Sequence, residues 1–322
     1  RRSWSGCRRP RRSRGAMPGM VAMGILRGVL EQVVEGEILY DEPMSRHTSY
    51  KIGGPADVMV CPRSAQGIQA ALRTAAEHRA SVFILGGGSN LLVRDGGIRG
   101  LVLNLYGTLK EMRAEGEEVT AGGGAKVTAL VNFCARRGLA GLEPMAGVPG
   151  SVGGAVKGNA GAFGATISDH LAAVRVLELT GEERVLSREA LRFAYRESSL
   201  TEGEVVVSAT FQLRRDDAAA LQQKVARILA ERKAKQPVEW RSAGSVFKNP
   251  PGDFAGRLIE GAGLKGTRVG DAMISPKHGN FFLNLGRATA RDVLALIALA
   301  QQRVREQSGI SLELEVRVVG EP

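Results

Sequence analysis

The stretch SAGSVFKNP (242–250) combines a hydroxyl group with a cation and an amide. Ser245 follows Gly244, and Lys248 and Asn249 come three and four residues later. A serine that is to give up a proton needs help from its neighbours, because a free hydroxyl is a very weak acid. Small residues ahead of Asn-Pro are also typical of an ordinary turn. The stretch by itself leaves open whether Ser245 takes part in chemistry.

Two further groups of polar side chains are of interest. FAYRESSL sets Tyr195 and Arg196 beside two serines. On base rates alone, the arginine would be a solvated surface residue. In SLELEVRVV (311–319), Glu313 and Glu315 alternate with apolar residues, which predicts a strand. Alternation alone does not exclude that both acids face solvent.

Glycine-rich runs offer backbone for a bound ligand. LGGGSNLLV (85–93) follows a predicted strand, and its Gly and Ser residues expose N–H groups that can converge on an anion. It lacks the Gly-Lys-Ser/Thr of a P-loop, so a phosphate site and a plain hairpin turn both stay open. GVPGSVGGAVKGNAGAFG (147–164) is poor in helix and strand formers. It suits backbone laid against a flat or phosphorylated ligand, with Asn159 as a side-chain partner.

One apparent dinucleotide motif fails its context test. GAGLKG (261–266) matches G-x-G-x-x-G, but it follows AGRLIE, which favours a helix, where the fingerprint needs a strand. We expect its glycines to end a short helix.

Composition and charge limit the class of protein. The 322 residues suggest two or three domains. Residues 1–16 hold seven arginines and no acid, and without them the net charge falls from +11 to +4. We expect a disordered basic tail there and no nucleic-acid partner, because no zinc-finger, RNP or helix-turn-helix pattern accompanies it. Three scattered cysteines indicate a reducing compartment and no metal site. No apolar run could span a bilayer, so we expect a cytoplasmic protein without a membrane partner. We also expect a monomer.

Helices and strands that would position these residues alternate irregularly. Helical spacing predicts helices over 64–79, 126–137, 216–236 and from 289 to about 307. Apolar runs predict strands over 81–85, 100–105, 172–179, 204–213 and 311–319. The mixture lacks a steady βαβ order and therefore predicts an α+β fold.

Eight motifs in order resemble one enzyme family. They are HTSYKIGGPAD, LGGGSNLLV, GVPGSVGGAVKGNAGAFG, AYRESS, SAGSVFKNP, AGRLIEGAGLKG, KHGNFFLN and LELEVRVVG. From about residue 40 to 320 the chain resembles the UDP-N-acetylenolpyruvoylglucosamine reductases, in the branch without a tyrosine-bearing insertion over the substrate. The resemblance implies a two-lobed FAD-binding region of the vanillyl-alcohol-oxidase (PCMH) type, with lobes at 17–105 and 106–214. It also implies an α+β substrate-binding domain at 215–322 whose final strand carries Glu315.

The resemblance further implies an activity and its reacting residues. The family reduces UDP-N-acetylglucosamine enolpyruvate to UDP-N-acetylmuramate in peptidoglycan synthesis, with FAD as cofactor, NADPH as co-substrate and a UDP-sugar as the small-molecule partner. Arg196 would stabilise the substrate carboxylate. Glu315, protonated or paired with arginine, would lie beside it; we choose it over Glu313 because the family motif puts the acid immediately before Val. Ser245 would donate the proton, with help from Lys248 or Glu315.

Ligand contacts are implied as well. Those to the cofactor would come from Tyr50, Ile52, Gly53, Gly86, Gly87, Gly88, Ser89, Asn90, Gly150, Ser151, Gly153, Gly154, Asn159, Ala160 and Gly161. Those to the substrate would come from Tyr195, Lys248, Asn249 and Lys265. The chain departs from the family pattern at Tyr50, where Phe is usual, at Phe163, where Tyr is usual, and at Lys157-Gly158, where an aromatic-Met pair is common.

Two other functions are compatible with the glycine-rich motifs. One is another flavin oxidoreductase of the same superfamily with a different substrate. The other is a non-catalytic flavin-binding protein. Arg196, Ser245 and Glu315 together favour enolpyruvyl reduction over both. Nucleic-acid binding through the arginine tail would predict a steep salt dependence that disappears when residues 1–16 are removed.

Overall fold

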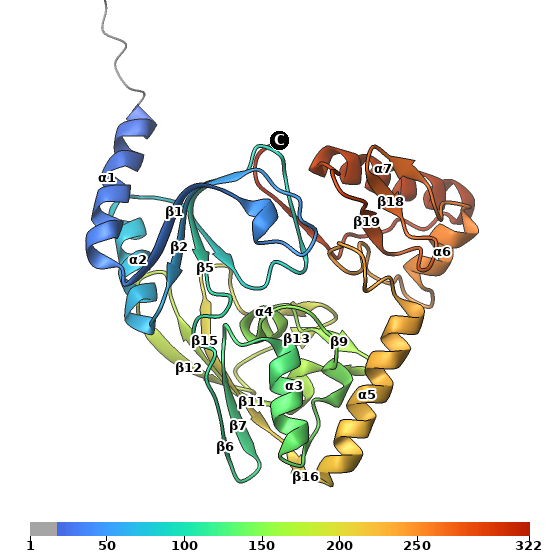
Figure 1. Cartoon of the computed structure of the whole chain (residues 1–322), viewed down its shortest axis with the longest axis horizontal. Helices are drawn as coiled ribbons and strands as arrows, with labels where there is room; N and C mark the ends of the chain where they lie inside the picture. The colour runs from blue at the N-terminus through green and yellow to red at the C-terminus, as the bar shows by residue number, and fades with distance from the viewer. Residues whose placement is uncertain (1–17) are drawn as a thin grey trace, which may run out of the picture.

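The structure is a computed structural model that describes residues 18–322, arranged as three groups of helices and strands (Figure 1). The predicted basic tail at 1–16 lies outside the described residues. Within 18–322, no helix is both long enough and apolar enough to cross a membrane.

The N-terminal group is a four-stranded sheet with two helices against it (Figure 1). The strand order is β1-β2-β5-β3; β1 is antiparallel to β2, and β5 runs parallel to β2 and β3. Leu30 of α1 packs with Val58 and Leu101 of the sheet. Ser64 begins α2 by accepting a backbone N–H of its first turn at 3.1 Å. The elements are α1 (Pro18–Val33), β1 (Gly36–Pro43), η1 (Met44–Arg46), β2 (Pro55–Pro62), α2 (Ala65–Glu77), β3 (Val82–Leu85), β4 (Leu91–Val93) and β5 (Ile98–Asn104).

The middle group is a five-stranded antiparallel sheet, in the order β12-β11-β15-β7-β6. Helices α3, α4 and α5 share its core, to which α5 contributes Leu221 and Val225. The division into domains at residue 215 stays a prediction. The elements are β6 (Met112–Glu115), β7 (Glu118–Gly122), α3 (Val127–Arg136), β8 (Leu139–Ala140), η2 (Glu143–Met145), α4 (Val152–Lys157), β9 (Gly161–Ala162), β10 (Ala165–Thr166), η3 (Ile167–His170), β11 (Leu171–Leu177), β12 (Glu183–Ser187), β13 (Phe193–Ala194), β14 (Glu197–Ser198), β15 (Val205–Gln212), β16 (Arg214–Arg215) and α5 (Ala218–Lys235).

The C-terminal group is a three-stranded sheet, β17-β18-β19, packed against α7. A capping box of Thr289 and Asp292 begins α7, and Gly309, in the left-handed region at φ 71°, ends it. The chain then returns to the N-terminal group, where β20 pairs in parallel with β4. The elements are α6 (Ala255–Gly261), β17 (Arg268–Val269), β18 (Ala272–Ile274), β19 (Phe282–Asn284), α7 (Ala290–Ser308) and β20 (Arg317–Val319).

Most of the predicted elements are present. The predicted helices are confirmed as α2, α3, α5 and α7, and α6 ends within GAGLKG as expected. The strands predicted at 81–85, 100–105, 172–179 and 204–213 are confirmed as β3, β5, β11 and β15. The long final strand is wrong, because only β20 forms a ladder. The residues before it make a single bridge, Phe247 to Leu314, on their way between two parts of the molecule.

The expectation that 147–164 forms no helix is also wrong, since α4 lies inside it. Ser151 caps α4 by accepting the N–H of Gly154 at 3.3 Å. Val152 and Val156 are buried in the core beneath it. A Cβ at Gly153 would lie 3.1 Å from the side chain of Val206, so the missing side chain lets α4 approach β15. Packing therefore outweighs the low helix propensity of glycine.

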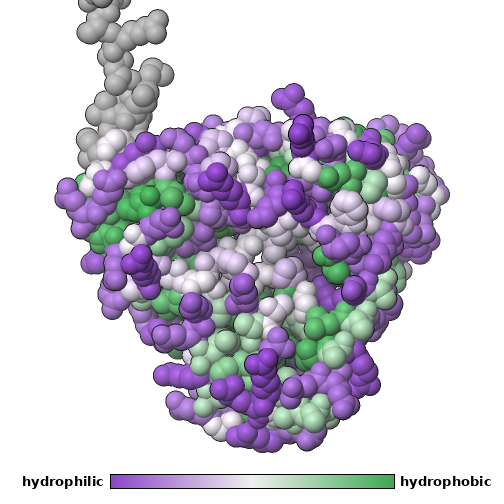
Figure 2. Space-filling view, in the orientation of Figure 1, coloured by the Kyte–Doolittle hydropathy of each residue, from purple (hydrophilic) through white to green (hydrophobic). Residues whose placement is uncertain are grey.

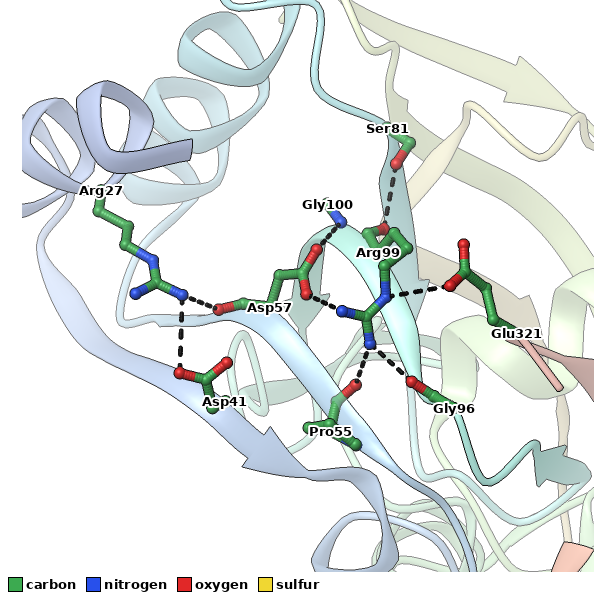
Figure 3. Close-up of polar contacts among 9 residues, drawn as sticks. All are labelled: Arg27, Asp41, Pro55, Asp57, Ser81, Gly96, Arg99, Gly100 and Glu321. Atoms are coloured by element: carbon green, nitrogen blue, oxygen red, sulfur yellow. Dashed lines mark hydrogen bonds and ion pairs between the residues drawn. The ribbon is translucent and has the colours of Figure 1, made fainter. Parts of the chain in front are cut away.

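The last residues of the chain are held on the N-terminal group by Arg99 (Figure 3). Its Nε lies 3.6 Å from the Glu321 carboxylate, and its guanidinium also pairs with Asp57. A further hydrogen bond, of 2.6 Å, reaches the carbonyl of Gly96. Arg27 donates to the carbonyl of Asp57 from α1. The chain that follows Glu315 is thus anchored to the N-terminal group.

Tyr50 allows a test of core packing. Its side chain is fully buried among C-terminal residues such as Phe247 and Phe282, and its hydroxyl has no hydrogen-bond partner among residues 18–322. We expect Tyr50→Phe to raise the free energy of unfolding by about 1 kcal/mol, because a buried unsatisfied hydroxyl costs about 1–3 kcal/mol. Urea denaturation measures this, with the exposed Tyr106→Phe as control. A loss of stability in Tyr50→Phe would contradict the prediction.

Candidate functional site

A cavity of about 1380 Å³ is lined by residues of all three groups. Figure 2 shows the surface hollowed near the middle of this face. Most of the predicted site residues line the cavity. They are Gly86, Gly87, Gly88, Ser89, Asn90, Gly150, Ser151, Gly153, Gly154, Ala160, Gly161, Arg196, Ser245, Lys248, Asn249 and Glu315.

Arg196 and Glu315 form an ion pair in this cavity, with 2.5 Å between Nε and the carboxylate. Both side chains are largely withdrawn from solvent, at 25% and 14% exposure. Arg196 occupies the two-residue turn between β13 and β14, where its φ is 61°. A side chain in this left-handed region is strained and is held there by its surroundings. The turn therefore aims a guanidinium at Glu315.

The charge state of Glu315 reflects two opposing effects. Burial raises the pKa of its carboxyl above the ordinary value, while the charges of Arg196 and Lys248 and the hydrogen bond from Arg196 act to lower it. The expected alternatives were a protonated or an arginine-paired carboxyl, and the geometry is that of the pair.

Ser245 is held by the backbone around it. Gly244 before it has φ 75°, a conformation that suits glycine. The side chain of Asn280 then receives the N–H of Phe247 at 2.9 Å and donates to its carbonyl at 2.8 Å. Asn280 is buried and did not appear among the expected site residues, although it lies within the quoted motif KHGNFFLN. It fixes the backbone beside Ser245.

The predicted substrate-binding side chains take different positions. Lys248 pairs with Glu197 at 3.0 Å and lies 3.9 Å from Glu313. The side-chain oxygen of Asn249 accepts the N–H at the start of α6. Tyr195 and Lys265 do not line the cavity; the Lys265 ammonium pairs with a glutamate of α6 at 2.7 Å.

The two glycine-rich loops pack against each other. A Cβ on Gly87 would lie 2.5 Å from the backbone of Gly150, and one on Gly86 would lie 2.5 Å from the hydroxyl of Ser151. These glycines thus serve close approach of loop to loop, and not only of backbone to ligand. Gly154 and Gly158 differ: both line the cavity, and a Cβ there would have as its nearest neighbour the hydroxyl of Ser151 at 3.3 Å or the carbonyl of Gly154 at 3.4 Å, not the other loop.

Four of the predicted cofactor-binding residues lie outside the lining. Tyr50 and Ile52 are buried in the core of the C-terminal group. Gly53 has φ 141° and packs against the side chains of its neighbours. Asn159 donates to the carbonyl of Ala194 at 2.9 Å, next to the Arg196 turn. Its buried Oδ1 has no hydrogen-bond partner among residues 18–322.

Several ionisable residues of the lining were not among the expected ligands, and His278 and Lys157 are two of them. Burial lowers the pKa of His278, whose Nδ1 accepts the N–H of Asn280 at 3.2 Å. Burial and the charge of Arg317 lower the pKa of Lys157, which donates to the carbonyl of Thr201 at 2.7 Å. The sequence did mark Lys157, because Lys157-Gly158 stands where the family commonly has an aromatic-Met pair.

Comparison with known proteins shows which class of enzyme the chain belongs to. Residues 56–187 match the family model described as the FAD binding domain. The chain is an FAD-dependent oxidoreductase with an α+β fold, as predicted. Residues 236–319 match the C-terminal domain of UDP-N-acetylenolpyruvoylglucosamine reductase. The chain belongs to the UDP-N-acetylenolpyruvoylglucosamine reductase family, which confirms the resemblance seen in the motifs.

Proteins named UDP-N-acetylenolpyruvoylglucosamine reductase are similar to this chain over nearly their whole length. A reductase of Desulforamulus reducens is 47% identical over 297 residues, which cover 92% of this chain and 98% of that protein. One of Listeria monocytogenes is 44% identical and covers 88% and 95%. A crystal structure of the enzyme from Thermus caldophilus has a TM-score of 0.76 and 39% identity, and covers 89% of this chain and 99% of that one.

The cavity fits FAD. Its volume exceeds the roughly 300–1,000 Å³ of ordinary ligand pockets, which leaves room for a second ligand. Within 18–322, the backbone N–H groups of Gly87, Gly88 and Ser89 have no acceptor, so they can receive a diphosphate. The buried, unpaired Oδ1 of Asn159, between the lining residues Gly158 and Ala160, is an acceptor without a donor in the described part of the chain.

The raised pKa of Glu315 predicts a pH dependence of stability. A carboxyl whose pKa is higher in the folded protein than in the unfolded chain stabilises the fold in acid, and this is lost as pH rises through the folded pKa. We compare the free energy of unfolding of the wild type with that of Glu315→Gln. We expect the wild-type value minus the variant value to fall as the pH rises above the ordinary pKa of a glutamate, about 4.3. Denaturant titrations at several pH values measure this. The exposed Glu313→Gln is the matched control, and an equal slope in both variants would contradict the prediction.

Proposed function

We propose that this chain reduces UDP-N-acetylglucosamine enolpyruvate to UDP-N-acetylmuramate with electrons from NADPH, and that Ser245, Arg196 and Glu315 carry the reaction. The observation behind this proposal is that the buried Arg196–Glu315 pair and Ser245 line the same cavity as the glycine-rich loops. A protein that only bound flavin would have no use for a strained arginine turn at this place.

The two glycine-rich loops would form the wall that holds the cofactor. The free N–H groups of residues 87–89 would receive the diphosphate. Gly154 and Gly158 line the cavity without side chains, which would let the backbone of α4 come close to a flat ring system. The unpaired oxygen of Asn159, between the lining residues Gly158 and Ala160, would accept an N–H donor. When bound, FAD would carry the hydride from NADPH to the enolpyruvyl double bond.

Arg196 would stabilise the negative charge that develops in the substrate. Hydride addition to the terminal carbon leaves an electron pair on the neighbouring carbon, conjugated with the carboxylate. A guanidinium matches a carboxylate by geometry and stays charged. It is already oriented by Glu315 and partly desolvated, so it stabilises the carbanion without a costly rearrangement.

Ser245 would complete the reaction by giving the proton of its Oγ to that carbon. The alkoxide left behind is unfavourable unless a cation or acid is near. Lys248 lies three residues further on and lines the same cavity, so its ammonium is the group we assign to this task. Asn280 holds the backbone between Ser245 and Lys248 in place.

The proposal also covers the partners and the location of the protein. One chain contributes every group that the mechanism needs, which supports a monomer. Cys61 and Cys134 are free thiols, which supports a reducing compartment such as the cytoplasm. The ligands are a UDP-sugar, FAD and NADPH, with no nucleic acid and no membrane.

Absorbance of the flavin tests the reaction as a whole. The full chain, loaded with FAD, should be bleached by NADPH without oxygen and should regain its colour when UDP-N-acetylglucosamine enolpyruvate is added. Mass spectrometry should then find UDP-N-acetylmuramate. A chain that takes up FAD but is not reoxidised by this substrate would overturn the proposed substrate, and one that cannot take up FAD would overturn the class of reaction.

The role of Ser245 has a separate prediction. We expect Ser245→Ala to be bleached by NADPH like the wild type, while reoxidation by the substrate slows by about 100- to 10,000-fold, the usual contribution of a general acid. Stopped-flow absorbance follows the two half-reactions separately. Ser308→Ala, which removes a hydroxyl from α7, is the control. Equal losses in both half-reactions would assign Ser245 to binding instead of proton donation.

A further inference from the structure

We propose that Asn90 is a positioning residue for Glu315, and that it couples the glycine turn of residues 86–90 to the Arg196–Glu315 pair. This inference rests on the proposed function of that pair. It gives Asn90 a task different from the one expected from sequence, which was contact with the cofactor.

Two hydrogen bonds with Asn90 hold the backbone on both sides of Val316. Its side-chain Nδ2 donates to the carbonyl oxygen of Glu315 at 2.9 Å. Its own carbonyl accepts the N–H of Arg317 at 3.0 Å. Asn90 is therefore continuous with the parallel pairing of β4 and β20 that begins at the next residues.

The opposite edge of this segment is held by the stretch that bears Ser245. The N–H groups of Glu315 and Val316 both donate to the carbonyl of Val246, at 2.8 and 3.2 Å. The N–H of Lys248 donates to the carbonyl of Glu313 at 2.8 Å. The backbone of Glu315 thus lies between two segments: its N–H donates to Val246, and its carbonyl accepts from Asn90.

Asn90 has no substitute in this arrangement. Within residues 18–322, the carbonyl of Glu315 receives a hydrogen bond from Asn90 alone. The 2.5 Å contact with Arg196 depends on where this backbone lies. A loss of the amide would loosen the Glu315 carboxylate without removing a charge from the cavity.

The position of Asn90 in the turn links the proposed cofactor site to the backbone of Glu315. Residues 87–89 carry the free N–H groups, and Asn90 follows them directly. A ligand that orders the turn would therefore also order the Glu315 segment through these two hydrogen bonds.

The test compares Asn90→Asp with Asn132→Asp. Both substitutions replace an amide by a carboxylate, but Asn132 lies exposed on α3 and outside the cavity lining. Only in Asn90→Asp does an acceptor replace the donor to Glu315. Asn90→Ala, which removes the donor without adding a charge, separates geometry from electrostatics.

Hydrogen exchange gives a readout that does not depend on activity. We expect peptides covering 311–319 to exchange faster in Asn90→Asp and Asn90→Ala than in the wild type or Asn132→Asp, even without FAD. In the wild type, adding FAD should slow exchange in this segment, and the Asn90 variants should lose that response. Unchanged exchange in the Asn90 variants would overturn the inference, whether or not the enzyme reduces the expected substrate.

Transient kinetics gives the functional readout. Asn90→Asp adds a negative charge beside the proposed diphosphate site, so both Asn90 variants are compared with the wild type at saturating FAD, where we expect NADPH to bleach the bound flavin. Reoxidation by the enolpyruvyl substrate should slow by about 100-fold, the effect of a misplacement of about 1 Å, and its pH profile should change. Weak FAD binding with unchanged exchange at 311–319 would instead make Asn90 a plain cofactor ligand. A wild type that binds FAD but does not turn over the substrate would overturn the proposed function, a result distinct from both.

Discussion

The ion pair between Arg196 and Glu315 is the interaction on which the arrangement of the site depends. It joins residues 119 positions apart in the chain, at 2.5 Å and largely out of water. Two buried charges are costly unless each has a well-placed partner. The molecule supplies that partner through a strained turn on one side and a backbone held by two neighbouring segments on the other. Loss of either member would leave an uncompensated charge in the cavity.

The rest of the cavity is organised around backbone and not around side chains. The loops at 85–93 and 147–164 touch each other where glycine lets their main chains approach. The free N–H groups of residues 87–89 and the backbone of Gly154 then face the cavity. A wall of this kind can accept a large cofactor with few side-chain contacts. It leaves the reacting side chains to come from elsewhere, at Arg196, Ser245 and Glu315.

Much of the fold was accessible from periodicity. Helices α2, α3, α5 and α7 follow from apolar spacing and caps, and β3, β5, β11 and β15 from apolar runs. The mistakes fall where tertiary contacts override local preference. Helix α4 forms from glycine-rich sequence because it packs tightly on β15, and the final strand is shortened because its first half crosses between two groups. Tyr50 shows the same limit: a residue in a glycine motif proved to be core.

The sequence by itself determined the family, the cofactor and the residue types able to do the chemistry, because eight motifs in order depend only on the chain. Only the tertiary structure decided how those residues are used. Lys248 turns to Glu197, Asn280 supports the Ser245 stretch, and Asn90 holds the carbonyl of Glu315. The physical reason is that hydrogen bonds and ion pairs act over about 3–4 Å in space. A linear pattern contains no information on which distant groups come that close.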